Sequence, residues 1–261
     1  MLKKFAVCAA VMASLYTASA LAAPTLRVGS ETTFPPFEFV DVKTKQFVGY
    51  EIDLINAVGK KAGYNISVQS MGFDAIIPAL MTGTVDVGVS GMTITPERKK
   101  KVDFTVPVFK GGLVAVVRQK DAAAYKTPAA IKGKQVCAQL GTTGQLKAEE
   151  ISGKKARTFN NAAEAMMELR NGGCDAVVAD KPVIEYFLKE SRQGRYFHEL
   201  PTQLTTEDWG FAVKKGNKSL LEWTNKEIKT LTSNGFFKDA YQSELAPSFT
   251  SDIKPGDVII E

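Results

Sequence analysis

The sequence predicts an α/β protein that is divided into two lobes. Short runs rich in β-branched residues alternate many times with segments of helical periodicity, a pattern typical of parallel strands whose faces are covered by helices. Two polar or glycine-rich stretches, at 110–112 and 205–208, interrupt this alternation. If both are crossings, the chain leaves the first lobe at one and returns to it at the other. At 261 residues, 44% of them hydrophobic, the chain is long enough to bury a core in each lobe.

The elements follow in order along the chain. Strand-like runs lie at 25–28, 64–68, 85–89, 113–117, 135–138, 175–178 and 209–213, and helical patterns at 50–62, 74–81, 96–101, 144–151, 162–170, 182–189 and 220–231. We therefore assign 23–109 and 209–261 to a first, discontinuous lobe and 110–208 to a second lobe. Two α/β lobes joined by two crossings enclose a cleft, and such folds bind ligands at the carboxyl ends of their strands.

The first 22 residues are typical of a secretory signal peptide. Lys3 and Lys4 precede an apolar run, which ends in an Ala-Leu-Ala sequence at 20–22 with small residues on either side of the leucine. This pattern predicts an exported protein in the periplasm or an equivalent extracytoplasmic space. Removal of residues 1–22 also removes Cys8 and leaves Cys137 and Cys174, for which we predict a disulfide in an oxidising compartment. The alternative is a pair of buried free thiols.

Composition and motifs argue against several classes of function. The formal charge of +5 comes from basic residues spread along the chain, with one short cluster at 98–101, which does not favour a nucleic-acid partner. A single histidine, His198, and the lack of a C-x-x-C motif leave no zinc pattern. The glycines at 88–91 and 141–144 match neither a nucleophile elbow nor a phosphate loop. We therefore predict no metal, no cofactor and no catalytic residue.

Six short motifs resemble, in order and spacing, those of the bacterial extracellular solute-binding proteins for polar amino acids. They are SETTFPPF at 30–37, GYEIDL at 49–54, FDAIIPAL at 73–80, SGMTITPER at 90–98, LGTTG at 140–144 and DAVVAD at 175–180. These proteins are the binding components of ABC importers, and the resemblance extends from about residue 26 to about residue 241. It implies the two-lobe periplasmic binding protein fold, in which each lobe is a mostly parallel sheet flanked by helices and joined to the other by two hinge crossings.

The resemblance implies that Arg98 binds the carboxylate of an amino acid. A guanidinium can engage both carboxylate oxygens, and Arg98 would lie just inside a helix that Thr95 caps. The family's main-chain and hydroxyl donors fall on Ser90, Gly91 and Thr93. Thr142 and Thr143, in the second lobe, would add the start of another helix, where free N–H groups suit an anion. Without the family, a solvated arginine in a lysine-rich helix is the better interpretation.

Asp180 falls at the family's ammonium-binding position. It follows a buried strand and precedes Pro182, so a role as a helix N-cap is the alternative, and one residue can serve both roles. Because Arg98 and Asp180 would lie on opposite lobes, an amino acid that bridges them would favour the closed cleft.

Four further residues are candidates for selecting the ligand's side chain: Glu31, Phe34, Phe73 and Gln139. The two phenylalanines match aromatic positions that sandwich the ligand in the family, and core packing is their alternative role. Glu31 can only accept hydrogen bonds when ionised, so it favours arginine, lysine, histidine or glutamine over acidic ligands.

The resemblance therefore implies a monomeric amino-acid receptor that delivers its ligand to a membrane ABC permease and is not itself an enzyme. The alternative within the same family is a secreted cyclohexadienyl dehydratase, which acts on prephenate or arogenate. The presence of both Arg98 and Asp180 favours binding of an amino acid instead, although arogenate is itself an amino acid.

Overall fold

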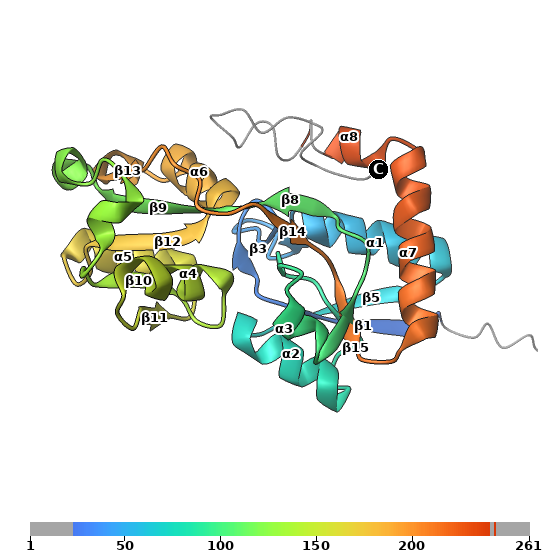
Figure 1. The fold of residues 1–261 in the computed structure, drawn as a ribbon. Coiled ribbons are helices and arrows are strands. Elements are labelled where there is room, and N and C mark those ends of the chain that lie inside the picture. The colour runs from blue at the N-terminus through green and yellow to red at the C-terminus, as the bar shows by residue number, and fades with distance from the viewer. Residues whose placement is uncertain (1–22, 241–242, 244–261) are drawn as a thin grey trace, which may run out of the picture.

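The computed structural model describes residues 23–240 and residue 243, arranged as two α/β lobes (Figure 1). The predicted signal peptide at 1–22 and the segment 244–261 lie outside the described residues. Within the described part, no helix is long and apolar enough to cross a membrane.

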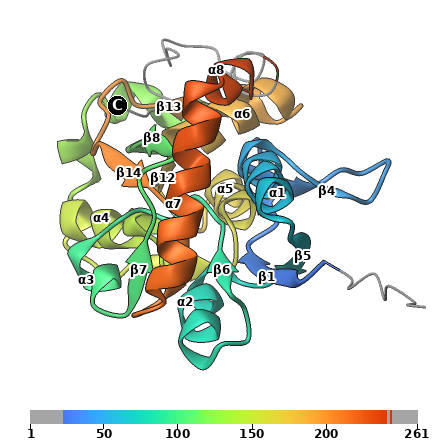
Figure 2. The ribbon, with the colours of Figure 1, turned by 90° about the vertical axis from the view of Figure 1, so that its right-hand side faces the viewer.

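The first lobe is built on a sheet with the strand order β5-β1-β6-β15-β7. Its strands are β1 (Thr25–Ser30), β5 (Asn65–Ser70), β6 (Val87–Gly88), β7 (Val102–Phe104) and β15 (Ala212–Lys214). A small sheet of β2 (Thr33–Phe34), β3 (Glu38–Val40) and β4 (Phe47–Val48) lies beside it. The helices are α1 (Tyr50–Ala62), α2 (Phe73–Thr82), α3 (Pro96–Lys99), α7 (Lys218–Ser233) and α8 (Phe236–Ala240). Seen from the side, α7 stands upright across this lobe (Figure 2).

The second lobe is built on a sheet with the strand order β11-β10-β12-β9-β13. Its strands are β9 (Leu113–Arg118), β10 (Val136–Gln139), β11 (Arg157–Phe159), β12 (Ala176–Asp180) and β13 (Phe197–Glu199). Its α-helices are α4 (Thr143–Ser152), α5 (Ala162–Asn171) and α6 (Lys181–Glu190). Three short 3₁₀ turns complete it at Gln119–Ala124, Pro128–Ile131 and Gly194–Tyr196.

A two-stranded antiparallel ladder connects the lobes. Strand β8 (Phe109–Gly111) pairs with β14 (Glu207–Trp209), with Glu207 opposite Gly111. Figure 1 shows both strands between the two large sheets. The crossings that the sequence predicts at 110–112 and 205–208 fall on this ladder.

Both large sheets are mixed, whereas the sequence pattern predicts mostly parallel pairing. Among the described residues, each sheet has two parallel and two antiparallel pairings. The antiparallel ones involve β9 and β15, which follow the connecting strands β8 and β14 with no helix between. Without a helical crossover to reverse its path, the chain enters each sheet against the direction of its neighbours.

Two glycines set the limits of α1. Gly49 precedes the helix with a φ of 115°, and a Cβ there would lie 2.5 Å from the main-chain oxygen of Phe37. Gly63 ends the helix in the left-handed conformation and caps its last carbonyls. Only glycine fits this entry, which explains why the helix begins at the predicted residue.

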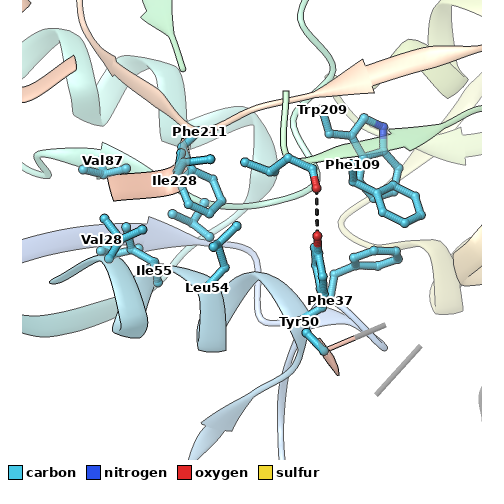
Figure 3. Close-up of a cluster of buried hydrophobic side chains, with 14 of the residues drawn as sticks. Val28, Phe37, Tyr50, Leu54, Ile55, Val87, Phe109, Trp209, Phe211 and Ile228 are labelled. Carbon is cyan, nitrogen blue, oxygen red and sulfur yellow. Dashed lines mark hydrogen bonds between the residues drawn. The ribbon is translucent and has the colours of Figure 1, made fainter. Parts of the chain in front are cut away.

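Aromatic side chains form the core of the first lobe next to the connecting ladder. Phe37, Tyr50, Phe109 and Trp209 are completely buried, and the ring centroids of Phe37 and Trp209 lie 4.9 Å apart. The hydroxyl of Tyr50 donates a 2.9 Å hydrogen bond to the carbonyl oxygen of Val108 (Figure 3). This packing fixes the ladder against α1, so the connection between the lobes starts from a rigid base.

Alternate residues of β12 pack into two different cores of the second lobe. Ala176 and Val178 join one cluster, while Val177 and Ala179 join the other. A strand buried on both faces carries a continuous apolar run, as the sequence at 176–179 does. The predicted disulfide is confirmed in the second of these clusters, where Cys137 of β10 is bonded to Cys174 across a Cα–Cα distance of 5.9 Å.

Candidate functional site

The structure brings all eleven predicted binding residues together around one pocket between the lobes. The first lobe contributes Glu31, Phe34, Phe73, Ser90, Gly91, Thr93 and Arg98, and the second lobe contributes Gln139, Thr142, Thr143 and Asp180. Most of them lie at strand ends or helix starts, as the α/β architecture predicts.

Arg98 is held by its own helix and by both lobes. The hydroxyl of Thr95 accepts a hydrogen bond from the Arg98 main-chain N–H at 3.2 Å, and Pro96 occupies the first turn, as predicted. Nη1 donates to the carbonyl oxygen of Thr93 at 2.8 Å, and Nη2 donates to that of Gly141 in the second lobe at 3.1 Å. The guanidinium also lies over the ring of Phe73, with Cζ 5.1 Å from the ring centroid. The head group is thus fixed in orientation.

The loop between β6 and α3 carries the other candidate carboxylate donors of the first lobe. The hydroxyl of Ser90 accepts a hydrogen bond from the main-chain N–H of Glu31 at 3.0 Å. The main-chain N–H of Gly91 donates to Glu51 Oε2 at 2.8 Å, so this donor is already paired within the protein. Gly91 has a φ of 52°, and a Cβ would lie 2.7 Å from the ring of Phe34. The buried Glu51 therefore shapes the loop, a function that the sequence analysis missed.

The N-terminus of α4 faces the pocket from the second lobe. Thr142 is its N-cap, and its hydroxyl accepts a hydrogen bond from the main-chain N–H of Gln145 at 3.2 Å while donating to the carbonyl of Gln139 at 2.8 Å. Thr143 is the first helical residue. The first turn of a ten-residue helix adds a partial positive charge at this wall of the pocket.

Asp180 ends β12 and reaches the pocket from the lobe opposite to Arg98. It occupies the N-cap position of α6, but its side chain makes no capping hydrogen bond, so capping does not explain this residue. Burial, and after it the negative charge of Glu207, raise the pKa of Asp180 to about 8, while the charge of Arg98 acts in the opposite direction. A buried carboxyl group of this kind gains most from a cationic partner that enters with a ligand.

The remaining residues form the other end of the pocket. Glu31 is buried, and its Oε1 accepts a hydrogen bond from the hydroxyl of Thr33. Burial raises the pKa of Glu31, and hydrogen bonds from Thr33 and Gln139 oppose that rise. Gln139 is fixed from behind, because its Nε2 donates to the carbonyl oxygen of Asn160 at 3.0 Å. A carboxyl group and an amide therefore meet here.

The two phenylalanines differ in their surroundings. Phe34 is buried, and its ring centroid lies 5.8 Å from that of Trp209 and 6.1 Å from that of Phe37, so it is part of the core as well as of the pocket. Phe73 begins α2, is only partly buried and supports Arg98. Both predicted roles of a phenylalanine, core packing and pocket lining, thus apply to Phe34.

Glu207 is a second residue beside this pocket that the sequence analysis missed. In the sequence it belongs to the polar stretch at 205–208, which predicts only a crossing between the lobes. In the structure it is buried on β14, and its carboxylate accepts hydrogen bonds from three threonine hydroxyls. One feature of the sequence could have indicated its burial: Glu207 lies two residues before Trp209, so in a strand both side chains point to the same, buried face.

Two α/β lobes with a polar pocket between them, lined by Arg98 from one lobe and by the carboxyl group of Asp180 from the other, define a ligand receptor of the two-lobe class. Residues 26–245 match the family model of the bacterial extracellular solute-binding proteins, family 3. The chain belongs to this family.

Comparison with individual proteins gives the same result. The chain is 34% identical over 235 residues to the ABC transporter arginine-binding protein 1 of Escherichia coli strain K12, which covers 89% of this chain and 95% of that protein. It is 33% identical over 224 residues to a probable histidine-binding protein of Neisseria gonorrhoeae, covering 84% and 82% of the two chains.

Solved structures agree with these relatives. An ancestral arginine-binding protein bound to arginine superposes with a TM-score of 0.79 at 39% identity, covering 86% of this chain and all of that one. An ancestral amino-acid-binding protein, a precursor of cyclohexadienyl dehydratase, superposes with a TM-score of 0.77 at 40% identity, covering 85% and 95%.

Proposed function

We propose that this protein is the receptor of an ABC importer and binds a polar L-amino acid, namely arginine, lysine, histidine or glutamine, between its lobes. The observation that carries the proposal is the position of Arg98 and Asp180 on one pocket but on opposite lobes. An amino acid presents a carboxylate and an ammonium group, and each needs an opposite charge once water is removed.

Each end of the ligand has a matching wall. Arg98 takes the carboxylate, assisted by main-chain N–H groups at Thr93 and at the start of α4 (Thr142 and Thr143), with Ser90 and Gly91 shaping the loop beneath it. Asp180 takes the ammonium group. The side chain then extends between Phe34 and Phe73 toward Glu31 and Gln139, which favours ligands that carry N–H donors at their far end. The relatives named for arginine and histidine support this class of ligand.

Binding and closure are coupled because the ligand's two charged groups attach to different lobes. A ligand that touches both walls binds the closed form more tightly than the open form, so it shifts the population toward closure. In this mechanism the first lobe consists of residues 23–109 and 209–261, and the second lobe consists of residues 110–208. The two lobes turn relative to each other about the β8–β14 ladder. The closed protein, a monomer exported to the periplasm by residues 1–22, presents a surface from both lobes to the membrane permease and performs no chemistry on its ligand.

A thermal-shift screen of the purified, ligand-stripped protein tests this proposal. The panel is the twenty amino acids with ornithine, citrulline, prephenate and arogenate, since a ligand that binds only the native state raises Tm by mass action. We expect shifts confined to arginine, lysine, histidine or glutamine, followed by calorimetric titration of the best ligand. No shift with any amino acid, but one with prephenate or arogenate, would favour the dehydratase alternative and would be followed by an assay for turnover.

A further inference from the structure

Glu207 lies where the two lobes meet at the pocket. Its Oε2 accepts a 2.7 Å hydrogen bond from the hydroxyl of Thr93 and a 2.8 Å hydrogen bond from the hydroxyl of Thr143. Its Oε1 accepts a third, of 2.9 Å, from the hydroxyl of Thr205. Only 8% of the residue's surface is exposed, so these bonds form largely out of water.

The two threonines that share Oε2 belong to different lobes. Thr93 lies in the loop after β6 and forms an isolated bridge with Trp209, whereas Thr143 is the first residue of α4. Their hydroxyl oxygens lie 3.4 Å apart. One carboxylate oxygen can accept both hydroxyl protons only while these two segments touch, which means only while the cleft is shut.

Glu207 itself lies on β14, within the ladder that connects the lobes. Its main chain is therefore close to the axis about which the lobes would turn, and its side chain can stay with either threonine when they separate. Charge strengthens each contact, because hydrogen bonds to an ionised group are about twice as strong as neutral ones.

We propose that Glu207 is a positioning residue that acts as an interlobe latch, with its carboxylate tying Thr93 to Thr143 and so stabilising the closed cleft around the ligand. The latch consists of protein atoms alone. It therefore contributes to closure whichever amino acid is bound, while Arg98, Asp180 and Glu31 select the ligand. The inference rests on the proposed receptor function for its effect on affinity, but its effect on closure does not depend on the ligand.

Two substitutions of Glu207 separate the contribution of its hydrogen-bond acceptors from that of its negative charge. Glu207→Leu removes both acceptors, whereas Glu207→Gln keeps one amide oxygen that can still accept two hydroxyl protons but removes the charge. We expect Kd for arginine, or for the ligand that the screen identifies, to rise about 10- to 100-fold in the leucine variant and by less in the glutamine variant. The rise should come mainly from faster dissociation in stopped-flow measurements, because the latch stabilises the closed form from which the ligand must leave.

Glu149→Leu is the matched control. Glu149 is a partly buried carboxylate that accepts hydrogen bonds from Gln145 and Ala156, all within the second lobe. We expect its Kd to stay within about threefold of the unmodified protein, the size of effect that a surface change produces. Equal weakening by Glu149→Leu and Glu207→Leu would overturn the proposal, because general destabilisation would then explain both.

A double-mutant cycle between Glu207→Gln and Thr143→Val tests the contact itself, and it remains informative if the leucine variant does not fold. A coupling of about fivefold or more in Kd is expected if the two side chains act together, and independent effects would overturn the latch. Small-angle scattering of the ligand-free protein provides a readout without ligand, in which Glu207→Gln should increase the radius of gyration. Failure of every amino acid to bind the unmodified protein would overturn the receptor function. An unchanged radius of gyration in Glu207→Gln would overturn the latch, whether or not a ligand is found.

Discussion

The side chain of Arg98 hydrogen-bonds the main chain of Gly141 in the opposite lobe, with Nη2 3.1 Å from the carbonyl oxygen. Nη1 is bonded to the carbonyl oxygen of Thr93 in its own lobe. A guanidinium has five N–H donors, so these two bonds leave three for a ligand carboxylate. One residue can thus hold the ligand and contact both lobes at once.

Arg98→Lys should therefore weaken binding even though it keeps the positive charge. An ammonium group cannot bind a carboxylate through a planar fork while it also reaches Thr93 and Gly141. We expect Kd to rise by about 30- to 150-fold in a calorimetric titration, the equivalent of one charge-assisted hydrogen bond of about 2–3 kcal/mol. The control is Arg157→Lys, because Arg157 pairs with Glu168 on the surface outside the pocket. A Kd within about threefold of the original for Arg98→Lys would contradict the assigned role.

Asp180 should be essential for binding but not for folding. Its raised pKa, about 8, means that the ligand-free protein holds this group mainly protonated at pH 7. Asp180→Asn then replaces one neutral group by another, so we expect Tm of the ligand-free protein to stay the same or rise. Both Asp180→Asn and Asp180→Ala should lose measurable amino-acid binding, because neither can neutralise a desolvated ammonium group. Retained affinity within a few-fold in either variant would refute the role.

Ligand binding should release a proton from Asp180. An ammonium group favours the ionised carboxylate and lowers its pKa from about 8, so below that pH binding and deprotonation are coupled. Affinity should rise by up to about tenfold per pH unit between pH 6 and 8 and level off above pH 8. Calorimetry in two buffers of different ionisation enthalpy counts the released proton. A binding enthalpy that is the same in both buffers would contradict the coupled release of a proton.

The stability of the ligand-free protein should have the opposite pH dependence. The folded-state pKa of Asp180, about 8, lies above its ordinary value of 3.8, so between these values the folded state binds more protons than the unfolded state. Stability therefore falls as the pH rises through this window. Burial also raises the pKa of Glu51 to about 7, which adds to the same trend. Urea unfolding at pH 5 and pH 8 should give the higher midpoint at pH 5, and a higher midpoint at pH 8 would show that these carboxyls ionise freely.

Sequence patterns predict those parts of the fold and of the site that depend on residues close together in the chain. Helix α1 was predicted with its observed limits because Gly49 and Gly63 leave little choice at its ends. The pocket residues were found because the family motifs fall at strand ends and helix starts, which the fold brings to one edge. Arg98 and Asp180 are distant in sequence, and only the resemblance placed them together.

Features that depend on contacts between distant segments were missed. Glu207 and Glu51 look like ordinary surface acids in the sequence, and their burial follows from the threonine hydroxyls and the Gly91 amide that they meet. The small β2–β3–β4 sheet was missed because its strands are two or three residues long, too short to show a period. The mixed strand directions likewise follow from how the chain re-enters each sheet, which no local pattern records.

Glu31→Gln should change which ligand is preferred. The substitution keeps the size of the side chain and removes its negative charge, which matters most for a ligand whose far end is cationic. We expect the ratio of Kd for arginine to Kd for glutamine to rise by about tenfold, because a hydrogen bond to a charged group is worth more than a neutral one. Competition between the two ligands on one protein sample measures this ratio directly. An equal loss of affinity for both ligands would show that Glu31 does not select between them.

The disulfide between Cys137 and Cys174 should stabilise the second lobe with little effect on binding. It joins β10 to the segment before β12 and closes a loop with a sequence separation of 37 residues. The chain-entropy model gives about 3–4 kcal/mol for a loop of this size. Replacing both cysteines by alanine, which avoids burying new hydroxyl groups, should lower the free energy of unfolding by about this amount in urea titrations. The pocket depends on Gln139 and Asp180 being held in register, and the β10–β12 pairing at Val136 and Cys137 provides that without the bond. Kd at 25 °C should therefore stay within about threefold, and a much larger loss of affinity would show that the covalent bond itself positions the pocket wall.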